Sequence, residues 1–247
     1  MRSICKTFGI TTLYLSGLLI ASIAFATPEF TSVTSLRIGD VTINVPAPEG
    51  FIETSANSAE LWQLAQSMSS GYSQTIAHYV TKSDFDAYNE NRSPAFSQYF
   101  IVQTPKSAKT LTATQQQFDR LRSETAAMQS ELKRSIEPRL SKELDKLNKN
   151  LSSQLGKPLA IGIGQIVPVS VNINRPNLLS YSVLSQISTS NKDGNTSDTL
   201  ILTTGVCFLK GKVVMLNSYR LFQAPQDLQT SREFIEKWAN TMLLSNQ

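Results

Sequence analysis

The fold is decided by one stretch near the C-terminus, Thr199–Leu244, which reads TLILTTGVCFLKGKVVMLNSYRLFQAPQDLQTSREFIEKWANTMLL. Residues 200–209 and 213–222 alternate as strands do, but both alternating sets are largely apolar. A sheet with one solvent-exposed face would show apolar residues in only one of the two alternating sets. We therefore expect a hairpin that turns at Lys210-Gly211, lies at the centre of the sheet, and is covered on both faces over at least its first half.

The same stretch closes with an amphipathic helix. After Pro225 the apolar spacing changes from the period of a strand to that of a helix. The predicted buried stripe consists of Leu228, Ser231, Phe234, Ile235, Trp238, Ala239, Met242 and Leu243. We expect this helix to cover one face of the hairpin, with Trp238 and Phe234 as major contributors to stability.

The first residues have the layout of a secretory signal peptide. Arg2 and Lys6 precede an apolar run over 8–25, and Ala24-Phe25-Ala26 is a small-x-small cleavage site. We predict a signal peptide over 1–26 that is cleaved after Ala26, which places the mature protein in the periplasm or outside the cell. The alternative is a retained anchor, because about 18 apolar residues nearly span a bilayer.

Charge and cysteine content limit the possible functions. The chain has 23 basic and 19 acidic residues, and loss of Arg2 and Lys6 leaves 21 basic residues. A mature chain this close to neutrality gives no electrostatic reason to expect nucleic-acid binding. Cys207 is then the single mature cysteine, so no intrachain disulfide forms, and its apolar neighbours favour a small buried side chain over a reactive thiol.

The remainder of the chain predicts clustered strands with helices between them. A strand over 41–45 follows a turn at Gly39-Asp40, and Asn57 with Glu60 predicts a cap for a helix over 61–68. The other expected strands are 74–82, 97–104, 161–173 and 178–188, with an irregular loop over 83–94, a turn over 174–177 and a loop over 191–198. We predict a single α+β domain over 27–247.

A long helical segment over 112–155 is the unusual feature. Thr112 or Thr114 caps it, an apolar stripe runs from Phe118 to Leu155, and Pro138 interrupts it. Some 42 helical residues would span about 63 Å, more than the roughly 44 Å diameter expected for the globule. The segment therefore kinks at Pro138, folds into a helical hairpin or projects as an arm. Its stripe either packs on the sheet or binds a protein partner or a second copy.

The order of these elements resembles the PsbP-like fold, an antiparallel sheet sandwiched by helices. The matching residues are Val45-Pro46 to Gly50-Phe51, Lys210-Gly211-Lys212-Val213 and the helix from Arg232 to Trp238. That fold occurs in photosystem PsbP proteins, Ran-binding Mog proteins and small periplasmic lipoproteins. The resemblance implies an accessory or binding role and no reaction. The anchoring Cys of the lipoproteins is absent after the leader.

Few residues suggest catalysis. His78, the single histidine, is either a hydrogen-bonded structural residue or a lone general base. Asp84, Asp86 and Glu90 faintly resemble a calcium loop but lack its glycine and final glutamate. The stretch Asn191 to Asn195, with Asp193, has turn chemistry. The pair Gly162 and Gly164 lacks the third glycine of a dinucleotide site and indicates the start of a strand.

We therefore expect an exported, non-enzymatic accessory or binding protein that needs no metal or cofactor. It would act through a groove beside the sheet or through the long helix, and a binding site would show a clustered apolar or aromatic patch. The alternative is a hydrolase that acts on envelope material with carboxylate chemistry. That reading requires Asp84, Asp86, Glu90 or Asp193 to meet around a deep pocket.

Overall fold

The predicted hairpin lies in the middle of the sheet. In a computed structural model, which describes residues 30–135, 149, 160–191 and 194–247, β8 (Gly194–Leu209) and β9 (Lys212–Leu221) pair antiparallel from Leu200↔Leu221 to Leu209↔Lys212. The turn between them places Lys210 at φ 49° and Gly211 at φ 76°. Positive φ at both turn residues matches the right-handed twist of the strands, and glycine adopts it without steric cost.

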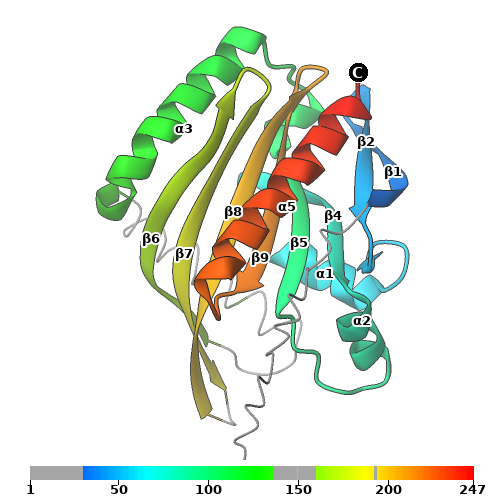
Figure 1. The fold of residues 1–247 in the computed structure, drawn as a ribbon. Helices are drawn as coiled ribbons and strands as arrows, with labels where there is room; N and C mark the ends of the chain where they lie inside the picture. Colours follow the sequence, from blue (N-terminus) through cyan, green and yellow to red (C-terminus); the bar gives the residue numbers. More distant parts are fainter. Residues whose placement is uncertain (1–29, 136–148, 150–159, 192–193) are drawn as a thin grey trace, which may run out of the picture.

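A seven-stranded antiparallel sheet extends to both sides of this hairpin in the order β3-β4-β5-β9-β8-β7-β6 (Figure 1). Its other strands are β3 (Phe51–Glu53), β4 (Ser73–Thr81), β5 (Gln98–Pro105), β6 (Ala160–Arg175) and β7 (Leu178–Asn191). A separate ribbon pairs β1 (Phe30–Ile38) with β2 (Val41–Pro48). The helices described are α1 (Ala59–Ser67), α2 (Lys82–Asn89), α3 (Gln115–Ser135) and α5 (Pro225–Leu244), with a 3₁₀ turn, η1 (Lys106–Lys109). This confirms the single-domain α+β prediction.

Both faces of the hairpin are covered, as the double alternation predicted. Cys207 belongs to a buried cluster with Ile235 and Trp238 of α5, whereas its neighbour Val206 belongs to a second cluster with Phe118 of α3. Consecutive strand residues point to opposite faces, so two separate cores meet across one strand. Gly205 allows the close crossing of α5, because a Cβ there would lie 3.0 Å from Ile235 Cγ2.

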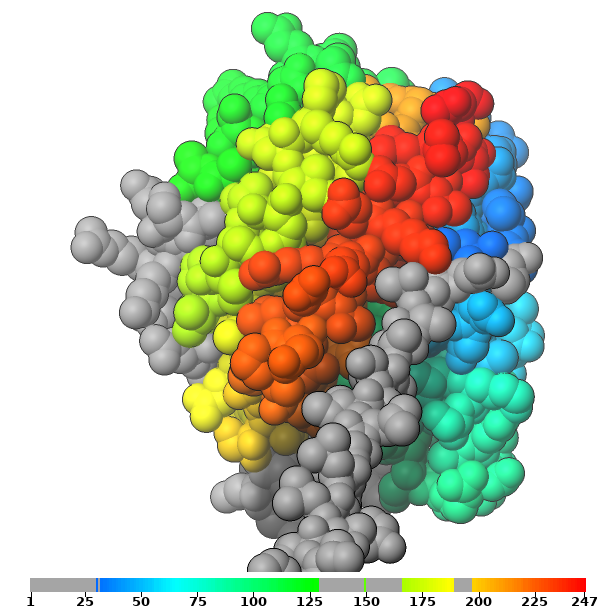
Figure 2. Space-filling view, in the orientation of Figure 1, coloured from blue at the N-terminus to red at the C-terminus, as the bar shows by residue number. Residues whose placement is uncertain are grey.

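The helix α5 is fixed by its indole and by its last residues. Trp238 is fully buried, its Nε1 donates to Pro46 O at 2.7 Å, and its ring meets Phe100 edge-on. At the end of α5, Asn246 accepts from Asn44 N at 2.8 Å and donates to Asn44 O at 2.7 Å, so its amide pairs with β2 as a strand would. Figure 2 shows α5, orange to red, lying across this face beside the blue β1 and β2. The ribbon is therefore docked on α5.

Three local predictions are wrong. The loop expected over 83–94 begins with α2, because Thr81 Oγ1 accepts from Asp84 N at 3.0 Å and caps that helix. The cap of α1 is Ser58, which accepts from Leu61 N at 3.3 Å, whereas Asn57 donates to Glu53 O. The loop expected over 191–198 is largely strand, since residues 194–198 pair with β7. In each case short polar side chains suited both a loop and the observed structure.

Two predicted regions lie outside the described residues, namely the signal peptide over 1–26 and the part of the 112–155 segment that contains Pro138. Helix α3 confirms the start of that segment. No helix within the described ranges is long and apolar enough to cross a membrane.

The indole of Trp238 provides a test of the α5 docking. We expect Trp238→Phe to lower the free energy of unfolding by about 1–3 kcal/mol, because the buried Pro46 carbonyl loses its donor. Leu244→Ala, at the exposed end of the same helix, should change it by less than about 0.5 kcal/mol. Urea unfolding measured by far-UV circular dichroism compares the two. Equal losses would mean that α5 is not held through its indole.

Candidate functional site

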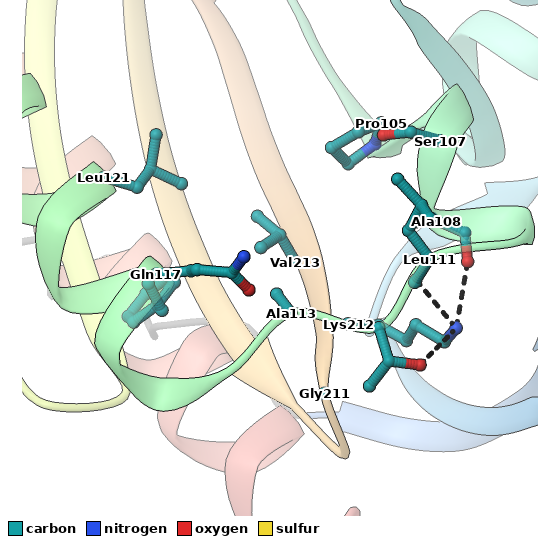
Figure 3. Close-up of a pocket in the computed structure, with 12 residues that line it drawn as sticks. Pro105, Ser107, Ala108, Leu111, Ala113, Gln117, Leu121, Gly211, Lys212 and Val213 are labelled. Atoms are coloured by element: carbon teal, nitrogen blue, oxygen red, sulfur yellow. Dashed lines mark hydrogen bonds between the residues drawn. The ribbon is translucent and has the colours of Figure 1, made fainter.

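An open cavity of about 390 Å³ lies beside the sheet where η1, the start of α3 and the tip of the central hairpin meet (Figure 3). Its walls come from the end of β5 with η1 and from the first turns of α3, and β9 forms the floor. The lining residues are Pro105, Ser107, Ala108, Leu111, Thr112, Ala113, Gln117, Phe118, Leu121, Gly211, Lys212 and Val213. We call this site the η1–α3 groove.

Helix α3 is held at the groove by its cap and by one aromatic anchor. Thr114 Oγ1 accepts from Gln117 N at 3.2 Å and Gln117 Oε1 accepts from Thr114 N at 2.8 Å, which is a reciprocal capping box. Of the two predicted caps, Thr114 is therefore the correct one. Phe118 is buried and stacks on Phe208 with 5.1 Å between ring centroids. Phe118, the first residue of the apolar stripe, therefore packs on the sheet. This agrees with the first of the two predicted alternatives, packing on the sheet rather than binding a partner.

The next residues of the stripe are not buried. Leu121 is 39% exposed and Met128 is 48% exposed, although Ala126 packs against the cluster around Phe118. The stripe from Ile136 to Leu155 lies outside the described residues. The stripe residues described in α3 therefore include both a residue packed on the sheet and exposed residues, and the exposed part begins at the groove.

The opposite wall is held by the buried ammonium of Lys212. Its Nζ donates to Ala108 O at 3.0 Å, Leu111 O at 3.1 Å and Thr112 Oγ1 at 3.4 Å, and it pairs with Asp40 at 3.1 Å. In Figure 3 the Lys212 side chain runs from β9 toward this wall. The residue is only 1% exposed, so its hydrogen bonds replace nearly all of its hydration. Its charge lowers the pKa of the exposed Asp40 carboxyl, mainly through their hydrogen bond.

Two glycines allow the loops around Lys212 to come close together. A Cβ at Gly39 would lie 2.3 Å from Lys109 O, and a Cβ at Gly211 would lie 2.4 Å from Thr112 Cγ2. Both glycines have positive φ, 62° and 76°. Ala113 N also donates to Gly211 O at 2.8 Å. The β1–β2 turn, the wall and the hairpin tip therefore form one tightly packed unit.

His78 is a buried, hydrogen-bonded residue on β4, away from the groove. It is 5% exposed, its Nδ1 lies 3.0 Å from Thr54 Oγ1, and burial lowers its pKa from 6.5 to about 4. It stays neutral at physiological pH, which agrees with the interpretation of His78 as a hydrogen-bonded structural residue.

Cys207 is also buried, and burial raises its thiol pKa to about 12, which confirms a buried rather than reactive thiol.

The structure does not gather the predicted carboxylates around the groove. Asp84 accepts from the backbone N–H groups of Ala95 and Phe96 at 2.9 and 3.0 Å, which anchors the segment after α2. Asp86 pairs with Lys82 at 2.6 Å and Glu90 with Arg92 at 2.7 Å, each within or just after its own helix. Asp193 lies outside the described residues. In the described part of the chain, no three His, Cys, Asp or Glu side chains are placed to hold a metal ion.

The sequence interpretation missed Lys212 and Leu111 as site residues. The signal for Lys212 was present, since Lys212, Val214 and Leu216 are alternate residues of β9 and all are buried. A lysine in line with two core residues indicates a buried charge that needs oxygen partners. Leu111 carried no such signal. Gly162 and Gly164 lie within β6, as predicted.

Comparison with known proteins finds a structural neighbour but no family. No protein-family model matches the chain, and no curated protein matches it. Among solved structures, the Ran-binding protein Mog1p of Saccharomyces cerevisiae is similar over 87% of this chain and 92% of its own, with 12% sequence identity and a TM-score of 0.32.

The charge of Lys212 provides a stability test of the wall. We expect Lys212→Met to lower the free energy of unfolding by about 3 kcal/mol, because the carbonyls of Ala108 and Leu111 lose a charged donor. Lys210→Met, two residues away and exposed, should change it by less than about 0.5 kcal/mol. Urea unfolding of the three proteins tests this. A similar small loss in both variants would contradict the assigned role of the ammonium.

The lowered pKa of His78 predicts a pH dependence of stability. Between pH 6.5 and about 4, the unfolded chain protonates His78 and the folded chain does not. Stability therefore falls as the pH falls through this window and becomes independent of His78 below it. From pH 7 to pH 5 the loss due to this residue should be about 2 kcal/mol.

The measurement is urea unfolding at pH 7 and pH 5 for the wild type and His78→Gln. The glutamine keeps a polar partner for Thr54 but does not titrate. We expect the loss between the two pH values to be about 2 kcal/mol smaller in the variant. If both proteins lose the same amount, His78 is not the residue responsible.

Proposed function

We propose that this chain is an exported, non-enzymatic binding protein and that the η1–α3 groove holds an apolar group of a partner. The observation that carries this proposal is the exposure of two leucines at an open cavity, with Leu111 63% exposed and Leu121 39% exposed. Val213 and the buried Phe118 also line this cavity. Exposed apolar side chains that gather around a hollow are typical of an interaction site.

The way in which the groove is built supports the same proposal. The hydrogen bonds of the Lys212 ammonium hold one wall in place. The Thr114 cap and the packing of Phe118 hold the other. Both walls are therefore held before any ligand arrives, and preorganisation lowers the entropic cost of binding. The groove also joins the two surfaces expected from the sequence, a hollow beside the sheet and the first part of the long helix.

The non-enzymatic part of the proposal rests on where the reactive groups lie. Asp84, Asp86 and Glu90 are engaged locally around α2, and His78 is neutral and buried beside Thr54. Among the described residues that line the groove, only Lys212 is ionisable, and its ammonium donates to the wall. A carboxylate hydrolase would need at least one acidic group in its cleft.

We further infer that the chain is a PsbP-like protein acting in the periplasm or outside the cell. The fold assignment is supported by the element order and by the Lys210 to Val213 turn and the Trp238 helix, in which Lys212 and Trp238 each hold a loop or ribbon. The location is supported by the leader pattern over 1–26.

Site-specific photo-cross-linking in cells tests the binding function. We expect a benzoylphenylalanine in place of Leu111 to give an adduct of defined mass on irradiation, in a fraction that contains exported proteins. The same residue in place of Leu244 is the matched control, because this leucine is 67% exposed but lies at the end of α5. Absence of an adduct at 111, or equal adducts at both positions, would refute the groove as the binding site.

A further inference from the structure

We propose that the occupant of the η1–α3 groove is an acidic segment of a partner protein that inserts a large apolar side chain. This inference rests on the proposed function and names the class of partner. It depends on two properties that coincide at one end of the molecule, namely the apolar groove and an excess of positive charge at its rim.

The excess charge comes from the three chain segments that meet around Lys212. Residues 36–42, 105–113 and 210–213 contain one acidic residue, Asp40. The same segments contain four basic residues that are exposed to solvent, Arg37, Lys106, Lys109 and Lys210. Two of these lysines belong to η1, whose other residues line the groove, and the third occupies the hairpin tip.

Contacts along the backbone hold these basic residues close together. Arg37 Nε donates to Gly39 O at 3.0 Å, and Gly39 lies against Lys109 O. Lys210 Nζ donates to Thr42 O at 3.5 Å, so the hairpin tip reaches the β1–β2 ribbon. We call the four exposed cations the basic rim.

The one carboxylate in these segments is already paired with a buried charge. Asp40 lies 3.1 Å from Lys212 Nζ, and that ammonium is 1% exposed. The Asp40 carboxylate is exposed, but the Lys212 ammonium balances its charge, so the positive charge of the basic rim is left largely uncompensated. An acidic partner would be attracted and oriented by this field, and basic partners would be repelled.

The groove itself suits a side chain better than a free metabolite. Its volume of about 390 Å³ is near the lower end of the roughly 300–1,000 Å³ found for small-molecule pockets, and Leu111 stands at its edge. In the described part of the lining, Lys212 is the one charged residue and none is acidic, and the Lys212 ammonium donates to the wall rather than to the cavity. An apolar centre surrounded by a charged rim is the usual anatomy of a protein–protein contact.

Peptide binding to the purified full chain tests this inference. The probe is a short fluorescein-labelled peptide of aspartate and glutamate around a central leucine–phenylalanine pair, and its twin has lysines in place of the acidic residues. We expect fluorescence anisotropy to detect binding of the acidic peptide only, with an affinity that falls as salt is raised. Reversal of three rim charges should weaken this binding at least about tenfold. The test variant carries Lys106→Glu, Lys109→Glu and Lys210→Glu.

A second triple variant controls for the change in net charge. It reverses three basic residues on α2, after α2 and on α5, none of which lines the groove. The control substitutions are Lys82→Glu, Arg92→Glu and Lys237→Glu. We expect its affinity for the acidic peptide to stay within about twofold of the wild type. An equal loss in both triple variants would show that net charge alone matters and would overturn the proposal.

Other occupants would give other results. Binding to vesicles with anionic lipid, without binding to the acidic peptide, would assign the basic rim to a membrane surface. A dimer seen by light scattering that the rim reversals dissociate would assign the groove to a second copy. Either result overturns the acidic segment as occupant. If the photo-cross-link at 111 also persists in the rim variant, the proposed binding function stands and only this inference fails.

Discussion

The buried ammonium of Lys212 is the interaction on which the site depends. Two segments that are far apart in sequence, the β1–β2 turn and the stretch after β5, meet the hairpin tip around it, because its oxygen partners come from Asp40 and from Ala108, Leu111 and Thr112. A charged group that is 1% exposed must be matched by hydrogen bonds, so these segments have little freedom to move independently. The wall of the groove is therefore a consequence of supplying one buried ammonium with oxygen partners in place of water.

The central hairpin determines the position of Lys212 in the fold. Trp238 and Ile235 cover one face of β8 and Phe118 covers the other, which leaves no solvent layer along the middle of the strand. At the tip of the hairpin, Gly211 packs against Thr112 and Lys212 is still buried. The groove lies beside this tip, between the first turns of α3 and the end of β5 with η1. The fold thus creates the hollow, and Lys212 fixes its shape.

Much of this fold was predictable from periodicity, and the site was not. Double alternation in 200–222 and the helical stripe ending at Met242 correctly predicted the central strands and the covering helix, because burial on two faces leaves a pattern in local sequence. Helix α2 was missed, since the Thr81 cap uses residues that also suit loops. The groove depends on pairs such as Lys212 with Ala108, 104 residues apart, which no local pattern encodes.

The basic rim and the apolar groove have different physical roles in the proposed binding. Exposed charges at the rim act over about 8–10 Å in physiological salt, so they influence how often and in which orientation a partner arrives. The apolar contacts at Leu111 and Leu121 act only after water has left the groove, so they influence how long the partner stays. Because Lys212 is paired inside the wall, it contributes to neither step directly. Its role is to keep the two surfaces next to each other, so that one segment of a partner can use both.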